Sequence, residues 1–452
     1  MKPLSPFDPA SLGRSVPRYT SYPTAPHFHE AVGPESYVRW LGSLGPETSL
    51  SLYVHIPFCD RLCWFCACRT QGTSSYRPLE RYLESVGREI EMVADATPAG
   101  RRVVHIHWGG GSPSVLTAED IARLSRMIAE AFPGATDAEF AVEIDPRDMT
   151  PARLDAFAEA GVNRVSVGVQ DFAPAVQAAI GRIQDAPLTR EVIEGMRARG
   201  VRSINIDLLY GLPRQTEASL RRTIEAVLAL SPDRLALFGY AHVPWMARRQ
   251  RMIDPAVLPD MEARRRQSDL ARALMLEAGY VAVGIDHFAR PGDGLVRALE
   301  AGTLRRNFQG YTTDPGEAMI SIGASAIGRM PQGYVQNRVS TADYLAAIEE
   351  GQFATQRGRS LTLDDRIRAA VIEQLLCHFC LDISALRARF GDMAGPALRV
   401  AEALRATAPE GTLVETETGF EIAEGWRNHA RLVAAEFDAY LAGGGVRHSV
   451  AL

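Results

Sequence analysis

Four of the six cysteines in this 452-residue chain lie within a short stretch of sequence. Cys59, Cys63, Cys66 and Cys68 come directly after a β-rich segment, so we expect them in a loop that follows a strand. A Cys-x3-Cys-x2-Cys loop can bring three thiolates around one face of an iron–sulfur cube and leave the fourth iron without a cysteine. That open iron can bind a small molecule. The spacing therefore indicates a cluster that takes part in catalysis as well as in electron transfer.

A zinc site is the main alternative for these cysteines. Zinc usually binds Cys-x2-Cys pairs, with a second pair of ligands at a distance. Cys377 and Cys380 could supply that second pair. Six cysteines are too few to stabilise a chain of this length through disulfides, and their clustering favours metal or redox chemistry in a reducing compartment.

Glycines and polar side chains follow the next β-rich segments. Residues 108–113 contain three consecutive glycines, which let a ligand approach the backbone closely. Taken alone, a run of glycines is more typical of a tight turn, and a single polar residue after a strand is more typical of a helix cap. Polar groups that end consecutive strands line the mouth of a barrel, so their joint occurrence favours a binding site. They are Glu143 and Asp145, Gln170 and Asp171, and Asn205 and Asp207.

A regular series of strands and helices has to position these residues. Short β-rich runs alternate with segments of helical periodicity, which predicts βα units and a parallel sheet. Six or seven units favour a complete or partial (β/α) barrel, with ligands at the carboxyl ends of its strands. The predicted strands are 51–57, 103–108, 139–144, 164–168, 203–208, 234–238 and 280–284. The predicted helices between them include 79–94, 118–131, 151–160 and 188–199.

Changes of pattern predict three parts: an N-terminal arm over residues 1–50, a barrel over 51–337 and a mostly helical domain over 338–452. In the last part Thr362 is expected to cap a helix that includes 367–379, a hairpin is expected at 412–423, and a final helix at 426–441. This order resembles a winged-helix module, which either binds DNA or covers the barrel. Nine arginines against thirteen acidic residues from position 361 onward favour the covering role.

The overall composition excludes several classes of protein. Hydrophobic residues make up 46% and charged residues 23% of the chain, as in ordinary globular proteins. The formal net charge of −5 gives no reason to expect binding to nucleic acid or to an anionic membrane. No apolar run reaches the roughly 18 residues that a membrane-spanning helix needs. The N-terminus lacks the apolar segment of a signal peptide, so we expect a cytoplasmic protein.

The cysteine loop, together with the glycines of 108–113, resembles the radical S-adenosylmethionine (SAM) superfamily. That superfamily carries a Cys-x3-Cys-x2-Cys motif at the end of the first barrel strand. On this resemblance Cys59, Cys63 and Cys66 bind a [4Fe-4S] cluster, and the amino and carboxylate groups of SAM chelate the open iron. Reductive cleavage of SAM would then give a 5′-deoxyadenosyl radical.

Longer motifs make the resemblance closer and extend it from about residue 17 over nearly the whole chain. They resemble the oxygen-independent coproporphyrinogen III dehydrogenase family, which comprises anaerobic coproporphyrinogen oxidases of the radical SAM type. The related haem-chaperone branch lacks the segment at 17–24 and the fourth cysteine, Cys68. The motifs that carry the resemblance are 17–24 (PRYTSYPT), 53–59 (YVHIPFC), 168–172 (GVQDF), 286–291 (DHFARP) and 306–313 (RNFQGYTT).

The family binds one SAM on the cluster and a second beside it, so the resemblance implies two SAM molecules per chain. It implies Tyr53, Glu143 and Gln309 as catalytic residues, and Phe308 and Gln309 belong to an active-site block. The expected contacts of the first SAM are Tyr53, Gly110, Glu143 and Ile327. Those of the second SAM are Phe65, Gly111, Ser112, Gln170, Arg182, Asp207 and Ala241. Asp207 suits ribose hydroxyls and Arg182 suits a carboxylate.

The resemblance implies an oxidoreductase that decarboxylates two propionates of coproporphyrinogen III to vinyl groups in anaerobic haem biosynthesis, giving protoporphyrinogen IX. We expect a monomer that works with an unidentified electron donor and acceptor, with residues 1–50 covering the active site. Arg18, Arg305 and Arg306 are candidates for propionate binding by chemistry alone. One alternative is a haem-binding chaperone, which the segment 17–24 disfavours. Another is a relative that methylates or cyclopropanates a different substrate, which the block 306–313 disfavours.

Cys68 belongs to the family pattern without an assigned role, whereas Cys377, Cys380 and Gly239 depart from that pattern. Cys68 is no cluster ligand on this resemblance, and an inert buried thiol is an equally good reading of it. Cys377 and Cys380 lie outside the motif, and spacing of three on a predicted helix would give them a common face and a packing role. Gly239 stands where the family commonly has a bulkier polar residue, which leaves the local pocket shape open.

Overall fold

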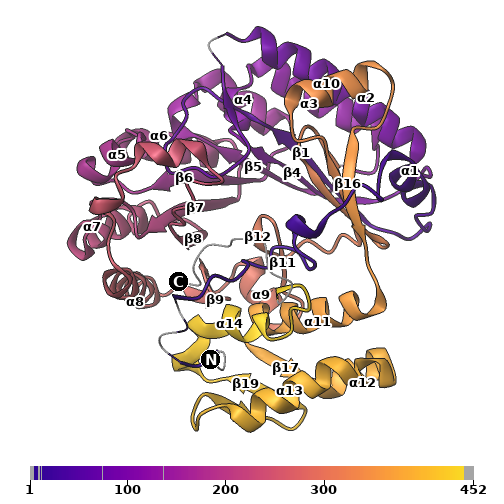
Figure 1. The fold of residues 1–452 in the computed structure, drawn as a ribbon. Coiled ribbons are helices and arrows are strands. Elements are labelled where there is room, and N and C mark those ends of the chain that lie inside the picture. Colours follow the sequence, from indigo (N-terminus) through magenta and orange to yellow (C-terminus); the bar gives the residue numbers. More distant parts are fainter. Residues whose placement is uncertain (1–4, 9–10, 12, 74, 136, 442–452) are drawn as a thin grey trace.

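The structure, a computed structural model, describes residues 5–8, 11, 13–73, 75–135 and 137–441. A twelve-stranded sheet and its covering helices form the larger part, and a smaller C-terminal domain lies beneath them in Figure 1. The order of strands across the sheet is β16-β15-β14-β13-β1-β4-β5-β6-β7-β8-β10-β9. Its two outermost strands, β16 and β9, are not paired with each other, so the barrel is open.

Seven neighbouring strands of the sheet run parallel and form the barrel proper. They are β1 (Leu50–Ile56), β4 (Val103–Gly110), β5 (Glu139–Ile144), β6 (Arg164–Gln170), β7 (Ser203–Tyr210), β8 (Arg234–Gly239) and β13 (Ala318–Ile322). Antiparallel strands extend both edges: β14 (Ile327–Met330), β15 (Gly333–Asn337) and β16 (Thr355–Ser360) on one side, and β10 (His287–Ala289) and β9 (Val281–Val283) on the other. The expected partial (β/α) barrel is confirmed as a fold.

Two strands differ from the prediction. The segment predicted as strand 280–284 forms β9, which pairs antiparallel with β10 at the sheet edge. The two are joined by a short turn at Gly284, and such a turn can connect only antiparallel neighbours. The seventh parallel strand is β13, which returns to lie beside β1 and was not predicted. The sheet also continues through β16 to Ser360, so the predicted domain boundary at 337 falls inside it.

Helices pack against the outer face of the parallel strands and enclose the main apolar core. In α2, buried side chains recur every three or four residues, as at Leu79, Leu83, Val86 and Ile90, and this spacing gives the helix one apolar face. The helices of this part are α1 (Pro34–Gly42), α2 (Arg77–Ala96), α3 (Ala118–Ala131), α4 (Pro151–Glu159), α5 (Pro174–Ile180), α6 (Ala186–Ala198), α7 (Glu217–Leu228), α8 (Met261–Glu277), α9 (Gly294–Glu300) and α10 (Thr341–Glu349).

The C-terminal domain has the element order expected of a winged helix. It runs α11 (Leu363–Cys377), β17 (Cys380–Asp382), α12 (Ile383–Phe390), α13 (Gly395–Thr407), β18 (Leu413–Glu415) and β19 (Gly419–Ile422). Thr362 caps α11 as predicted, because its side chain accepts a hydrogen bond from the Asp365 backbone N–H. The predicted hairpin forms, and β17 adds a third strand to it.

Two predictions for this domain are wrong. The last helix is not continuous: a 3-10 helix at Glu424–His429 precedes the short α14 (Ala430–Ala435). Residues 442–452 of the predicted third part lie outside the described residues.

Cys377 and Cys380 do not share a helix face, because α11 ends at Cys377 and Cys380 begins β17. Cys377 is buried in an apolar cluster with Leu295 and Tyr311, and Cys380 is partly exposed.

The first part of the N-terminal arm packs on the C-terminal domain, whereas Tyr37 and Leu41 of α1 belong to the main core of the barrel. Phe7, Val16, Tyr19 and Tyr22 belong to the same apolar cluster as the helices of that domain. Tyr19 donates a hydrogen bond to Asp438 at 3.1 Å. Residues 1–4, 9, 10 and 12 of the predicted arm lie outside the described residues. Figure 1 shows the arm passing between the sheet and the C-terminal domain, and it also shows the small hairpin of β11 (Arg305–Asn307) and β12 (Gly310–Thr312) beside it.

No helix among the described residues is long and apolar enough to cross a membrane.

Candidate active site

The cysteine loop begins where β1 ends and is held in place by short contacts. Cys59 lies in β2 (Phe58–Cys59), which pairs with β3 (Gln71–Gly72). The backbone N–H of Trp64 donates to the carbonyl of Ile180 at 2.8 Å, which ties the middle of the loop to α5. Cys63 is buried, whereas Cys59 and Cys66 are partly exposed.

Two arginines place positive charge beside Cys63. Arg147 Nη2 lies 3.4 Å and Arg182 Nη1 lies 3.5 Å from the Cys63 sulfur. Both guanidinium groups also contact the Asp145 carboxylate, at 2.6 and 2.9 Å. Cationic neighbours stabilise a thiolate, which is the form of cysteine that binds metal. Neither Arg147 nor Asp145 was assigned this role from the sequence.

The three thiols influence one another and fit a cluster chemically. A hydrogen bond from Cys68 lowers the pKa of Cys66 to about 6, against the effect of burial. Burial raises the pKa of Cys59 to about 12, and the nearby charges of Cys66 and Cys63 act in the same direction. Among the described residues, no three His, Cys, Asp or Glu side chains are already arranged as ligands of one metal ion. Three soft thiolate donors on one loop beside two guanidinium groups suit an iron–sulfur cluster.

Cys377 and Cys380 do not supply a second pair of zinc ligands beside the loop. Cys377 packs in an apolar cluster formed around α9, and Cys380 lies in the sheet of the C-terminal domain. Cys68 is exposed, and its backbone N–H lies 3.4 Å from the Cys66 sulfur. Cys68 is therefore not a buried residue, as one reading of the sequence expected, and its hydrogen bond with Cys66 raises the pKa of its thiol.

The glycine segment after β4 lies directly against the start of the cysteine loop. The N–H groups of Gly111 and Ser112 donate to the carbonyls of Ile56 and Phe58, each at 2.8 Å. A Cβ atom at Gly111 would stand 2.4 Å from the Phe58 carbonyl oxygen, which is closer than any side chain allows. Gly110 adopts a φ of +103°, which disfavours other residues. Glycine is therefore required for this close approach of two backbone segments.

A group of polar residues on β1, β4 and β5 lies on the inner face of the sheet. Tyr53 Oη donates to His55 Nδ1 at 2.9 Å. On the neighbouring strands His107 Nε2 lies 3.1 Å from Glu143 Oε1, and the N–H of Gly110 donates to Glu143 Oε2 at 3.2 Å. Tyr53 and His107 are also in ring contact, with centroids 5.8 Å apart. The predicted residues Tyr53, Gly110 and Glu143 thus come together.

Burial sets the protonation states in this group. Burial lowers the pKa of His107, although the Glu143 carboxylate opposes the shift, so His107 is neutral near pH 7. For Glu143, burial would raise the pKa, but the hydrogen bonds from His107 and from the Gly110 N–H act against it, and the pKa is lowered. If His107 Nε2 carries the proton toward Glu143, its Nδ1 is left as an acceptor. That atom is buried and has no hydrogen-bond partner among the described residues, so it can serve a bound ligand.

The residues expected around the second SAM lie on the next strands. Asp207 of β7 accepts hydrogen bonds from Ser166 Oγ at 2.9 Å and from Asn205 Nδ2 at 2.8 Å. Burial raises the pKa of Asp207 against these hydrogen bonds. Gln170 ends β6 with a φ of +69°, a conformation that is rare outside glycine and is common near functional sites. Arg182 Nη2 donates to the Gly168 carbonyl at 2.6 Å.

Other predicted residues are joined less directly. Gln250 Nε2 donates to the carbonyls of Phe65 at 2.7 Å and Ala241 at 3.0 Å, so it links two segments far apart in sequence. Ser112 Oγ is hydrogen-bonded to Ser114 at 2.6 Å. Ile327 begins β14, two strands away from β1, and Gln309 lies in the turn between β11 and β12.

Sequence reasoning missed several residues of the site: His55, His107, Arg147, Ser166 and Gln250. Two of them carried a readable signal. His55 is two positions from Tyr53, and His107 is two positions from His105, and this spacing puts polar side chains on one face of a strand. Gln250 carried no such signal, because Phe65, whose carbonyl it binds, lies 185 positions earlier in the chain.

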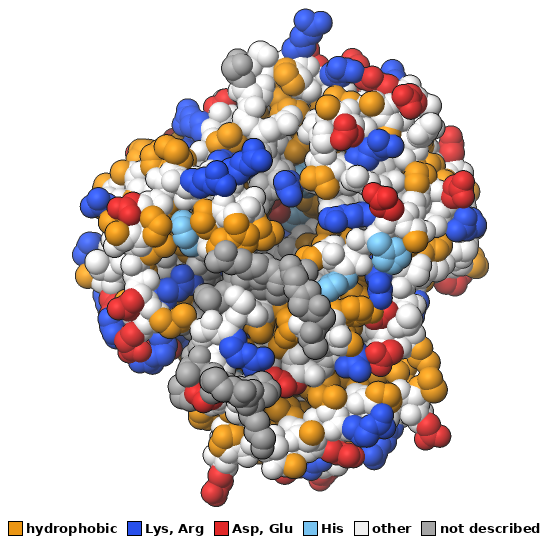
Figure 2. Space-filling view, viewed as in Figure 1, with side chains coloured by type: hydrophobic (Ala, Val, Ile, Leu, Met, Phe, Trp, Pro, Cys, Tyr) orange, Lys and Arg blue, Asp and Glu red, His pale blue; other side chains and the backbone are white. Residues whose placement is uncertain are grey.

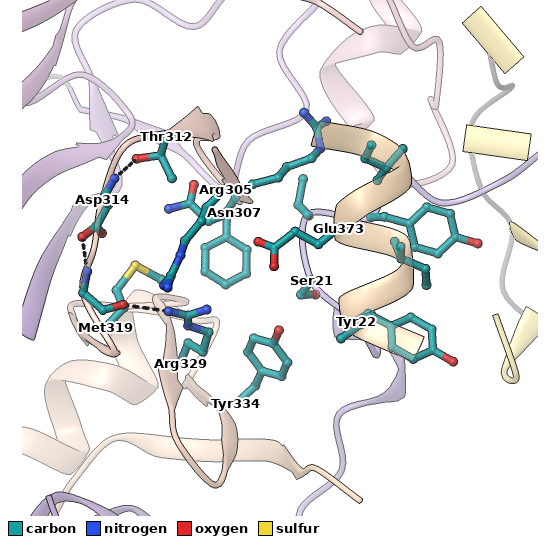
Figure 3. Close-up of a pocket in the computed structure, with 18 residues that line it drawn as sticks. Ser21, Tyr22, Arg305, Asn307, Thr312, Asp314, Met319, Arg329, Tyr334 and Glu373 are labelled. Carbon is teal, nitrogen blue, oxygen red and sulfur yellow. Dashed lines mark hydrogen bonds between the residues drawn. The ribbon is translucent and has the colours of Figure 1, made fainter. Parts of the chain in front are cut away.

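A cavity of about 120 Å3 lies between the arm, the β11–β12 hairpin and α11. Figure 3 shows Glu373 of α11 pointing toward the middle of this cavity, with Ser21 and Tyr22 of the arm along one side. Arg329 is held by a hydrogen bond from its Nη2 to the Gly316 carbonyl at 2.8 Å. On the face shown in Figure 2 the surface is hollowed over the part of the sheet that includes β5, and several Lys or Arg side chains lie around the hollow.

Comparison with known proteins identifies the family. The family model of the radical SAM superfamily matches residues 53–227. Over 426 residues the chain is 47% identical to the oxygen-independent coproporphyrinogen III oxidase of Paracoccus denitrificans, and this match covers 94% of each chain. The chain belongs to the oxygen-independent coproporphyrinogen III oxidase family.

Other members of the oxidase family are similar over the same span. The oxygen-independent coproporphyrinogen III oxidase of Escherichia coli is 39% identical over 431 residues, which cover 94% of this chain and 93% of the relative. A solved structure of coproporphyrinogen III oxidase from Escherichia coli, described as a radical SAM enzyme, superposes with a TM-score of 0.90 at 38% identity. It covers 95% of this chain and 100% of its own. As a radical SAM oxidase of this family, the protein uses a [4Fe-4S] cluster and SAM.

Proposed function

We propose that this oxidase converts coproporphyrinogen III to protoporphyrinogen IX by radical oxidative decarboxylation of two propionate side chains, in anaerobic haem biosynthesis. The observation that carries the proposal is the three-cysteine loop at the end of β1, with the Tyr53–His107–Glu143 group beside it. The names of the relatives, whose matches cover nearly the whole chain, supply the substrate.

The reaction balances for each propionate separately. A hydrogen atom leaves the β-carbon of the side chain, and the resulting carbon radical loses carbon dioxide and one electron. The two carbons that remain form the vinyl group. The electron passes to an acceptor that the chain does not supply. Two propionates therefore require two hydrogen abstractions, two molecules of carbon dioxide lost and two electrons removed.

We assign the cluster to Cys59, Cys63 and Cys66, with Tyr53, Gly110, Glu143 and Ile327 at the SAM bound to its open iron. When bound, the cluster supplies the electron that cleaves SAM to methionine and a 5′-deoxyadenosyl radical. Arg147 and Arg182 place positive charge beside the Cys63 sulfur. Glu143 is ionised and can accept hydrogen bonds from a ligand, while neutral His107 orients it. Gln309 stays a candidate catalytic residue on the resemblance alone.

A second SAM molecule is assigned to the ends of β6 and β7. Its contacts are Phe65, Gly111, Ser112, Gln170, Arg182, Asp207 and Ala241. Support comes from Asp207, a half-buried carboxylate on the inner face, and from Arg182, whose buried Nε has no hydrogen-bond partner among the described residues. A second site would allow both decarboxylations without full release of the intermediate.

Equilibrium dialysis with labelled SAM tests the second site. The wild type should bind two equivalents, and Asp207→Ala should bind the second more than tenfold more weakly, because a charge-assisted hydrogen bond contributes roughly 1.5–3 kcal/mol. The cluster-bound equivalent should be unchanged. One equivalent on an active wild type, or two unchanged equivalents on the variant, would contradict the assignment.

The remaining parts of the proposal concern the setting of the enzyme. It acts as a monomer in the cytoplasm, with the arm covering the active site, and it exchanges electrons with a separate donor and acceptor. We expect no contact with nucleic acid, since the C-terminal domain is acidic overall.

Anaerobic turnover tests the function. The reconstituted protein with coproporphyrinogen III, SAM, a reductant and an electron acceptor should give protoporphyrinogen IX and 5′-deoxyadenosine, and Cys63→Ser should give neither. Cleavage of SAM without decarboxylation, together with tight haem binding, would instead support a haem chaperone.

A further inference from the structure

A cleft lies between the carboxyl end of β8 and the C-terminal domain, and none of the cluster cysteines lines it. It measures about 350 Å3 and is lined by α8, the β9–β10 turn, β11 and residues 424–431. Figure 1 shows α8, β9 and α14 near one another in this region. The arm reaches the cleft through Arg18, whose Nη2 donates a hydrogen bond to the Gly239 carbonyl at 2.9 Å.

The lining carries an excess of positive charge. Six of the lining residues are arginines and three are carboxylates. Two of the carboxylates are paired with arginines of α8: Asp269 with Arg265 at 2.8 Å, and Glu424 with Arg272 at 4.0 Å. The excess therefore belongs to the floor of the cleft rather than to these two pairs.

The floor of the cleft is formed by Arg18, Asp286, Arg306 and Arg431, so that one carboxylate faces three guanidinium groups there. Asp286 interacts with Arg18, Arg306 and Arg431. The Asp286 carboxylate is already engaged, since it receives a hydrogen bond from His287 Nδ1 at 2.8 Å and lies 3.7 Å from Arg306 Nη1. Three positive charges against one negative charge leave the floor two charges short of balance.

Arg306 has donors to spare. Its side chain is only 5% exposed, and its guanidinium lies over the Tyr311 ring, 4.6 Å from the centroid. Its Nε and Nη1 atoms are buried and have no hydrogen-bond partner among the described residues. A buried donor without a partner costs free energy, and the cost is larger on a charged group. An anion at this position would relieve it.

The neighbouring arginines show the same shortage of negative charge. Burial lowers the pKa of Arg431 to about 10, and the positive charge of Arg18 acts in the same direction. Burial also lowers the pKa of Arg18, against the attraction of Asp286. Buried cations are normally paired, so these groups are expected to gain an anionic partner when a ligand binds.

We propose that Arg18, Arg306 and Arg431 form a carboxylate-binding site, and that this site holds a propionate of the substrate that is retained in the product. The proposal rests on the proposed function and names residues for substrate binding that the function leaves open. Guanidinium groups suit it because they bind carboxylates through two parallel hydrogen bonds.

Position along the strands decides which propionate the site holds. Tyr210 lines the cleft and lies three residues beyond Asp207 on β7, which is about 10 Å at the spacing of a strand. Propionates that react have to lie near the SAM sites on β1 to β7. A tetrapyrrole carries its four propionates around its rim, so one of them can reach the cleft while another reacts. The carboxylate in the cleft is then an anchor.

Gly239 keeps space for this arrangement. A Cβ atom at this position would lie 2.9 Å from Tyr210 Oη and 3.4 Å from Arg264 Nη2. A bulkier residue would therefore displace Tyr210 or Arg264 at the edge of the cleft. The departure from the family at Gly239 thus widens the cleft on the side of β8.

Binding of coproporphyrin III tests the site without turnover. This oxidised form of the substrate keeps all four propionates and is fluorescent, so its dissociation constant can be measured with the holoenzyme under anaerobic conditions. Arg18→Gln and Arg431→Gln should each weaken binding at least tenfold. Arg266→Gln is the matched control, because Arg266 is an exposed arginine of α8 paired with Glu217 at 2.8 Å, and it should bind like the wild type.

Two further ligands separate the possible causes. The tetramethyl ester of coproporphyrin III has no free carboxylates, so the wild type and the three variants should bind it equally. Loss of ester binding in Arg18→Gln or Arg431→Gln would show that these arginines maintain the structure of the cleft and do not bind a carboxylate, which would overturn the site. Protoporphyrin IX keeps only the two retained propionates, and its binding should also weaken at least tenfold. Equal affinities in all proteins, or weaker binding of coproporphyrin III alone, would contradict the proposal.

Failure of the proposed function gives a different result. Wild-type enzyme that binds coproporphyrin III through these arginines but does not decarboxylate coproporphyrinogen III would contradict the function and leave the carboxylate site standing.

Discussion

Charged side chains surround the sulfur of Cys63 in the cysteine loop. Arg147 and Arg182 both contact the Cys63 sulfur, and Asp145 holds both guanidinium groups in place. For Asp145, burial would raise the pKa, but the two arginines outweigh it and lower the pKa. The arrangement keeps two cations beside the Cys63 sulfur even before a cluster binds.

Cysteine variants test the ligand assignment at the same scale. Cys59→Ser, Cys63→Ser and Cys66→Ser should each lose the brown cluster absorbance and the activity, because a serine oxygen is a poor replacement for a thiolate in an iron–sulfur cluster. Cys68→Ser should keep the cluster, and its exposed side chain makes it the natural control. Iron and sulfide analysis of the four proteins measures the effect. Complete loss of iron from Cys68→Ser would show that the assignment is wrong.

Glu89 predicts a pH dependence of stability. Its buried carboxyl accepts hydrogen bonds from Tyr344, Asn337 and the Gly323 N–H, and burial raises its pKa to about 7 despite them. A carboxyl whose folded pKa lies above its unfolded value favours folding below pH 4.5, and the benefit is lost as the pH rises to about 7. The loss amounts to about 3 kcal/mol at most.

Denaturant unfolding between pH 4.5 and 8 measures this effect as the difference between the wild type and Glu89→Gln. The wild type should lose stability relative to the variant across pH 4.5 to 7, and the difference should be constant above that range. Parallel curves over the whole range would mean that Glu89 has the same pKa in the folded and unfolded chains.

At the scale of elements, the arm and the C-terminal domain share one apolar core, although they are the two ends of the sequence. Phe7, Val16, Tyr19 and Tyr22 of the arm are each no more than 4% exposed within that core. Arg18 lies between Val16 and Tyr19 and reaches the barrel. The arm therefore connects the stability of the C-terminal domain to the shape of the cleft.

Removing residues 1–30 should leave the cluster in place, because the loop and the parallel strands do not depend on them. The C-terminal domain should become susceptible to proteolysis, since a buried large apolar side chain contributes roughly 1.5–3 kcal/mol and four are removed. Turnover should fall. Limited proteolysis and cluster absorbance measure the two effects, and Val38→Ala, at an exposed position of α1, is the control. Normal turnover with an intact C-terminal domain would contradict this role of the arm.

How far the sequence predicted each element depended on whether local pattern or long-range pairing decides it. The helix expected at 118–131 matches α3 at both ends, because Thr117 caps it and its apolar spacing is regular. β13 was missed, since its place beside β1 depends on pairing between segments more than 250 positions apart. The final helix was too long because a 3-10 segment replaces its first turns, and Cys380 lies in a strand of only three residues.

The same contrast holds for the site. The cysteine loop and the strand-end residues could be read from type and spacing. The pairing of His107 with Glu143 and of Asp145 with two arginines could not, because it depends on which strands are neighbours. The arginine cluster combines the arm, β11 and α14, three segments that only the tertiary structure brings together.

At the scale of the whole molecule, the barrel, the arm and the C-terminal domain meet at the cleft beneath β8. We propose that the polar residues on the inner face of the sheet serve the cluster and SAM, and that the arginines of the cleft serve a carboxylate. With the SAM sites and the arginines in different places, the substrate would be held by one propionate while hydrogen is removed from another.

We propose that a radical formed at the cysteine loop removes hydrogen from the propionate β-carbon. Coproporphyrinogen III deuterated at the β-carbons of its propionates tests it directly, with mass spectrometry of the 5′-deoxyadenosine formed under anaerobic turnover. We expect one deuterium in each 5′-deoxyadenosine, and two 5′-deoxyadenosines and two molecules of carbon dioxide for each protoporphyrinogen IX. Protoporphyrinogen IX accompanied by 5′-deoxyadenosine without deuterium would contradict it.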